Sequence, residues 1–151
     1  MIQIKNLNKK FTLNGSFVKK LAAEILKSIN KDIDLEIVFL DDRAITRLNK
    51  EYKKLDRPTD VLSFKLDRRE FGQKGGLGDI FISLDTARRN AKIYSTRFED
   101  EIVLYVIHGI LHLFGYDDET VKSRARMSKR QGAVLEGLCN RENLSRVLTR
   151  Q

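Results

Sequence analysis

The chain has 151 residues, which suits a single domain over residues 1–151 with a real hydrophobic core, and its one cysteine, Cys139, excludes an internal disulfide framework. Its 29 Lys and Arg residues against 21 Asp and Glu residues give a formal charge of +8, which favours a polyanionic partner, nucleic acid ahead of an anionic membrane. No apolar stretch approaches the roughly 18 residues that span a bilayer, and the N-terminus lacks a signal-peptide core, so a cytoplasmic protein without membrane association is expected.

The first half of the chain predicts strands and helices in alternation. Residues 1–6 alternate weakly and predict a strand, while residues 18–29 carry apolar side chains at helical spacing after the turn Asn14-Gly-Ser16, which holds a candidate cap. Residues 33–39 alternate again, which predicts a strand with one buried face. Two aspartates then open a short predicted helix over residues 41–52.

The second half predicts two further strands and then helices. The strands are expected over residues 60–64 and 77–83, with a charged, glycine-bearing loop at 67–76 between them. The order of strand, helix, strand, helix, strand, strand and helices argues for an α+β fold. In this fold a small mixed β-sheet is covered by helices, with the most apolar helix buried at the centre.

Three helices are expected after the strands. Asp85 or Thr86 begins the first, and Thr96-x-x-Glu99 forms a capping box for the second, which is the apolar helix. Residues 119–138 predict the last helix, whose basic face is either an ordinary solvated face or a surface for RNA. That face consists of Lys122, Arg124, Arg126, Lys129 and Arg130.

Both histidines of the chain lie in one apolar run, residues 102–114, at positions i and i+4. On a helix His108 and His112 share one face, so their imidazoles can reach the same ion. Gly115 ends the helix, and Asp118 can return to the open side of the pair. The spacing H-x-x-x-H-x-x-G-x-x-D matches the metzincin layout with a carboxylate as the third ligand. The alternative is a pair of structural histidines, each satisfied by a polar partner in the core.

Two imidazoles and one carboxylate suit one zinc ion and leave a fourth position for water, although nickel, manganese and iron accept the same ligand types. Zinc can lower the pKa of bound water to about 7, which allows attack on a peptide carbonyl or on a phosphodiester. Gly109 stands where H-E-x-x-H peptidases have their glutamate base. The glycine therefore disfavours a metallopeptidase and favours phosphodiester cleavage.

The stretch from His108 to Asp118 resembles the H-G-x-L-H-L-x-G-Y-D-H signature of the YbeY family, the bacterial rRNA maturation endoribonucleases. The segments 48–64 and 77–80 agree with the same family, so the resemblance spans residues 48–118. The resemblance implies a small zincin-like α+β fold and a metal-dependent hydrolase acting on RNA. It also implies metal ligands at His108, His112 and Asp118.

The chain departs from this family at two positions. Asp118 stands where the family usually has histidine, and Lys53 stands where the family usually has an arginine assigned to catalysis. Lys53 can supply a positive charge to a phosphate, but a lysine cannot form the bidentate fork of arginine; the alternative is an exposed loop lysine. Ser63 and Asp79, in the matching segments, either support the ligands or are ordinary strand residues.

The site favours a metal-dependent hydrolase, and the resemblance implies that it is an endoribonuclease that cleaves single-stranded RNA in rRNA maturation and ribosome biogenesis. Its expected partners are RNA and ribosomal particles. Two alternatives stay open. One is a ribosome-assembly factor with a structural metal and no catalytic activity, and the other is the metallopeptidase that Gly109 disfavours.

Overall fold

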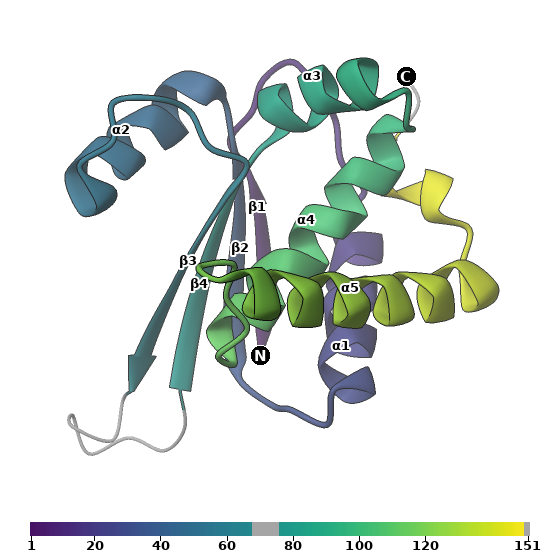
Figure 1. The fold of residues 1–151 in the computed structure, drawn as a ribbon. Helices are drawn as coiled ribbons and strands as arrows, with labels where there is room; N and C mark the ends of the chain where they lie inside the picture. The colour runs from purple at the N-terminus through teal and green to yellow at the C-terminus, as the bar shows by residue number, and fades with distance from the viewer. Residues whose placement is uncertain (68–75, 150–151) are drawn as a thin grey trace.

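The computed structural model describes residues 1–67 and 76–149 (Figure 1). In chain order its elements are β1 (Ile2–Asn6), α1 (Gly15–Ser28), β2 (Asp34–Leu40), α2 (Asp42–Lys53), β3 (Val61–Asp67), β4 (Gly76–Ser83), α3 (Leu84–Tyr94), α4 (Phe98–Leu113), α5 (Val121–Arg141) and the 3-10 turn η2 (Leu144–Val147). This is the predicted order. The charged loop expected at 67–76 falls largely on residues 68–75, outside the described residues. None of the described helices is long and apolar enough to cross a membrane.

Four strands form one mixed sheet in the order β1-β2-β4-β3. β1, β2 and β4 are parallel, and β3 runs antiparallel to β4. The register places Ile4, Ile37, Ile80 and Ser63 side by side in one row across the four strands. The α+β prediction of a small mixed sheet covered by helices is confirmed.

Side chains alternate along each strand, so both faces of the sheet carry apolar residues, and helices cover both faces. α1, α4 and α5 lie to one side of the sheet in Figure 1, and α2 lies toward the other. The strand residues under α1 and α4 include Ile37, Phe39, Ile80 and Ile82 in the larger core. Those on the α2 side are Val38, Leu40 and Leu62, which form a smaller core with Ile45 of α2.

Two of the predicted helix caps are wrong. The N-cap of α3 is Ser83, whose buried side chain accepts the Thr86 N–H at 3.1 Å. α4 begins after Arg97 without any side-chain cap, because the Thr96 hydroxyl donates instead to the carboxylate of Glu101 at 2.7 Å. At α4 the buried Glu101 carboxylate outcompetes the local capping pattern, since a buried carboxylate without a partner is costly.

α4 occupies the centre of the molecule, as predicted. In Figure 1 it runs diagonally across one face of the sheet, and α5 crosses it on the side away from the sheet. Most residues of α4 are buried, including Ile102, Ile107 and Ile110 with essentially no exposure. A helix that is apolar on nearly every side is stable only in such a position.

Two glycines let α4 lie directly against the sheet. A Cβ atom added to Gly109 would lie 2.7 Å from a methyl carbon of Ile80 and 3.1 Å from one of Val61. A Cβ atom added to Gly78 of β4 would lie 2.5 Å from a methyl carbon of Leu113. Real Cβ atoms do not approach carbon atoms this closely, so α4 or Ile80 would have to move to admit a side chain at position 109. At position 78 the end of the flexible Leu113 side chain would have to shift.

Gly109→Ala is therefore expected to lower the free energy of unfolding by about 1–3 kcal/mol, because the new methyl group overpacks the contact between α4 and the sheet. The matched control is Gly132→Ala in α5, where nothing lies within 4 Å of the added Cβ. That change is expected to raise stability by about 0.5–1 kcal/mol through the higher helix propensity of alanine. Urea unfolding in the presence of chelator measures the free energy of unfolding of both variants. Equal stabilities of the two variants would contradict the packing argument.

Candidate metal centre

The two histidines lie on one face of α4, one turn apart, near its C-terminal end. Both side chains are half-buried. The Nε2 atoms of His108 and His112 are 2.9 Å apart, and their ring centroids are 4.5 Å apart. Two ring nitrogens that converge in this way can share one proton or coordinate one cation, as the spacing of i and i+4 predicts.

The turn after α4 brings a carboxylate to the histidine pair. Gly115 has a φ of +90°, which a larger residue would adopt only with strain, and its N–H lies 3.3 Å from the His112 carbonyl oxygen that accepts it. The chain reverses at this glycine. Asp118 returns so that one carboxylate oxygen and one nitrogen from each histidine all lie within 4.8 Å of one another. The structure thus brings together the three residues that the spacing pattern singles out.

The neighbouring Asp117 is engaged in the turn instead. Its carboxylate accepts the N–H of Glu119 at 3.1 Å. Hydrogen bonds from Ser123 and from this N–H hold the pKa of Asp117 below its ordinary value. The Asp118 carboxylate makes no hydrogen bond to any other described residue. Of the two adjacent aspartates, Asp118 is the one whose oxygens are available to an ion.

A glutamine on α5 orients the first histidine. Oε1 of Gln131 is in hydrogen-bonding contact with Nδ1 of His108. An amide oxygen can only accept, so this contact assigns the proton of neutral His108 to Nδ1 and leaves the Nε2 lone pair facing His112. Histidines that bind metals usually have such a partner on the other ring nitrogen.

Gln131 is absent from the site predicted from sequence, although a signal for it exists. It interrupts an apolar stripe on α5, and a polar residue in such a stripe usually has a buried partner. The buried members of the stripe are Met127, Val134 and Leu138.

The surroundings of the site favour the neutral form of His112. Burial lowers the pKa of His112, and electrostatic interactions with His108 and Lys53 lower it further, against the opposing effect of Asp118 and Asp117. A lowered pKa keeps the imidazole neutral at pH 7, and a neutral imidazole is the form that binds a cation.

The sheet supports the histidine turn of α4 through one hydrogen bond. The Ser63 hydroxyl donates to the Gly109 carbonyl at 2.9 Å, which ties β3 to the helix between the two histidines. Asp79 lies on the other face of the sheet from its neighbour Ile80, which packs beneath Gly109. Burial and the charge of Glu36 raise the pKa of Asp79. Of these two strand residues, only Ser63 touches the site.

Lys53 is the last residue of α2 and is exposed. Its charge helps to lower the pKa of His112, so it lies on the same side of the molecule as the histidines. It forms no ion pair with another described residue. The end of α2 is held by the Tyr52 ring, which packs on Phe64 of β3 with centroids 5.0 Å apart. Lys53 is therefore a cation on an anchored helix end, near the three converging side chains but outside their group.

Comparison with known proteins decides the family. The family model described as Endoribonuclease YbeY matches residues 3–139. The chain belongs to the Endoribonuclease YbeY family. The YbeY match covers β1 to the last turns of α5, so it includes the histidine pair, the returning aspartate and the glutamine that orients His108.

Curated YbeY endoribonucleases resemble the chain over most of its length. The Moorella thermoacetica protein is 38% identical over 135 residues, which are 84% of this chain and 85% of that protein. The Desulforamulus reducens protein is 34% identical over 147 residues, which are 91% and 96% of the two chains. The Myxococcus xanthus protein is 46% identical over 108 residues, 70% of this chain but only 35% of that longer protein.

A solved structure agrees with the fold. The solution structure of a Thermotoga maritima protein superimposes with a TM-score of 0.64 at 28% identity and covers 93% of this chain and 90% of that one.

The geometry predicts different effects for the two adjacent aspartates. Asp118→Ala is expected to lose most of the bound metal, because it removes one of three converging ligands. Asp117→Ala is expected to retain the metal, since its carboxylate holds the turn. Asp118→His is expected to bind zinc, because it restores a third ligand. The metal content per chain is measured for all three variants after dialysis. A metal-free Asp117→Ala beside a fully loaded Asp118→Ala would overturn the assignment.

Proposed function

We propose that the chain is a metal-dependent endoribonuclease that cleaves single-stranded ribosomal RNA during ribosome biogenesis, with His108, His112 and Asp118 as the ligands of one zinc ion. Membership of the Endoribonuclease YbeY family makes the chain a hydrolase that acts on RNA. The observation that carries the metal-dependent part of the proposal is the convergence of two imidazoles and one carboxylate within 4.8 Å.

The residues present fit a catalytic zinc ion. Two neutral imidazoles and one carboxylate make three ligands, the number usual in open catalytic sites, whereas structural zinc sites are usually closed by four. Bound zinc supplies a Lewis acid and an acidified water for hydrolysis at neutral pH. The carboxylate of Asp118 in place of a neutral third imidazole makes the site one unit less positive and the water correspondingly less acidic.

The remaining residues position these ligands and the substrate. Gln131 holds the proton of His108 on Nδ1, so that Nε2 keeps its lone pair toward the centre of the site. Lys53 supplies a positive charge that can balance a phosphate oxygen as charge develops on it. The Arg126 guanidinium of α5 lies 4.6 Å from the ring centroid of Tyr116. Tyr116 belongs to the turn that carries Asp118. Cations and aromatic faces beside a hydrolytic site suit a single-stranded nucleic acid.

A digest of RNA and of peptides tests the proposal. Purified protein is expected to cleave a single-stranded ribosomal RNA fragment and not a peptide library, to lose this activity in chelator and to regain it with zinc. Circular dichroism of the metal-free protein is expected to show an intact fold, because the core around α4 is apolar. An intact fold with unchanged RNA cleavage in the absence of metal would contradict the catalytic role of the ion.

Lys53 is tested by its own variants. Lys53→Ala is expected to slow RNA cleavage roughly tenfold, because one charge-assisted phosphate contact is lost, while the metal content stays unchanged. Lys53→Arg is expected to keep or raise the rate. The control is Lys54→Asn, which removes a neighbouring charge at a residue with a φ of 60°, a conformation that asparagine tolerates. Single-turnover cleavage rates decide, and equal rates for Lys53→Ala and Lys54→Asn would remove Lys53 from the mechanism.

A further inference from the structure

Among the strands of residues 1–67 and 76–149, β1 is an edge strand, with no partner on the side away from β2. Two hollows adjoin this edge. One, of about 490 Å³, is lined by the consecutive strand residues 2–5 together with the start of α1. The other, of about 600 Å³, continues from the same strand along α1 to residues 30–33. Ile2 and Lys19 line both hollows, so the two adjoin, and together they are called here the β1 groove.

The backbone of β1 presents hydrogen-bonding groups to this groove. On the inner side, the Met1 carbonyl oxygen accepts a β2 amide at 2.9 Å, and the Leu7 amide donates to a β2 carbonyl at 2.8 Å. Backbone groups of successive strand residues point to opposite edges, so the odd-numbered residues face β2. The N–H and C=O groups of Ile2 and Ile4 therefore point outward. An extended chain laid along the edge would pair with them as an added strand.

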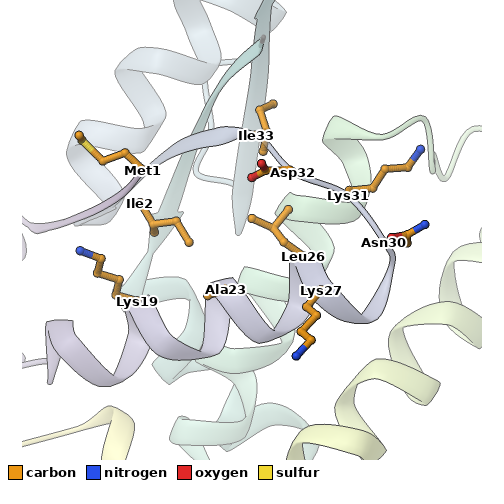
Figure 2. A pocket seen from close by; sticks show the side chains of 10 residues that line it. All are labelled: Met1, Ile2, Lys19, Ala23, Leu26, Lys27, Asn30, Lys31, Asp32 and Ile33. Carbon is orange, nitrogen blue, oxygen red and sulfur yellow. The ribbon is translucent and has the colours of Figure 1, made fainter.

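The floor of the β1 groove is aliphatic and its rim is basic. Figure 2 shows Ile2, Leu26 and Ile33 around the middle of the larger hollow, with the Asp32 carboxylate between Leu26 and Ile33 in this view and the ammonium groups of three lysines toward its periphery. These lysines are Lys19, Lys27 and Lys31. Neither Lys19 nor Lys27 forms an ion pair with another described residue, and Asp32 is the one acidic residue in the lining of either hollow.

We propose that the β1 groove binds an extended acidic peptide segment of a partner protein, which adds a strand to β1 and places its carboxylates against Lys19 and Lys27. Alternate side chains of an added strand point to the same face, so every second residue of the segment would pack on the aliphatic floor. The main-chain hydrogen bonds hold the segment, and the lysines select its charge.

Two other occupants fit the groove less well. Single-stranded RNA is held by aromatic faces on which its bases stack, and no aromatic residue lines either hollow. A second copy of this chain would bring another formal charge of +8 to the same basic rim, which like-charge repulsion disfavours.

The probe is a capped peptide of alternating valine and glutamate, about six residues long to match β1. Its counterpart has lysine in place of glutamate. The acidic peptide is expected to bind saturably and the basic one is not. Lys19→Glu combined with Lys27→Glu is expected to weaken binding about tenfold, because two attractive charges become repulsive. The matched control, Lys92→Glu with Lys129→Glu, makes the same change of net charge on α3 and α5, away from the groove, and is expected to bind normally.

A second variant tests the strand pairing itself. Ile4→Pro removes an N–H that points away from β2, so the pairing of β1 with β2 stays intact while peptide affinity is expected to fall about fivefold. Ile4→Val keeps the N–H and is the control. In hydrogen exchange, the bound peptide is expected to slow the amides of Ile2 and Ile4 more than those of Gln3 and Lys5. Equal affinity for the two peptides, unaltered binding by Ile4→Pro, or slowing of these amides by an RNA oligonucleotide in place of the peptide would overturn the proposal.

Discussion

The close contact between α4 and the sheet is the constraint on which the site depends. Gly109 carries no side chain at the point of contact, so the helix backbone lies directly on Ile80, and the Leu113 side chain packs over Gly78 of β4. His108 is the residue before Gly109, and its depth in the molecule follows from this contact. A larger residue at position 109 would lift the histidine turn away from the Ser63 hydroxyl that holds it. The geometry of the three converging side chains therefore rests on an apolar contact beneath them.

The same contact bears on the chemistry. In H-E-x-x-H peptidases the residue after the first histidine is a catalytic glutamate. In this chain the side-chain direction at Gly109 points into Ile80 and Val61, where even a methyl group would be too close. A glutamate there would face the sheet and could not reach a water in the site. The site offers cations instead, Lys53 among them, which suits a substrate with charged phosphate oxygens better than a neutral peptide.

Local patterns predicted much of this molecule, and contacts between distant segments account for what they missed. The spacing of His108 and His112 and the turn at Gly115 are properties of one helix and its end, so a short stretch of sequence determines them. Gln131 is 23 residues from its partner His108 and reaches it only because α5 crosses α4. The Thr96-x-x-Glu99 capping box failed for a related reason, since a buried carboxylate captured the threonine hydroxyl. Propensity and spacing show which local structures and hydrogen bonds a segment can form, and burial determines which of these hydrogen bonds form in the folded protein.

The two edges of the sheet have different surroundings. Next to β3 lie the end of α2 and the histidine turn of α4, and the β1 edge carries the groove. One row of side chains connects the two sides, because Ile4, Ile37 and Ile80 stand in register and Ile80 touches the position of Gly109. Contiguity of this kind does not by itself transmit a signal, since coupling between sites requires an element with two alternative arrangements. The row consists of packed isoleucines in a continuous strand ladder, a rigid arrangement. A strand added at β1 would therefore tether a partner to the protein without altering the metal centre.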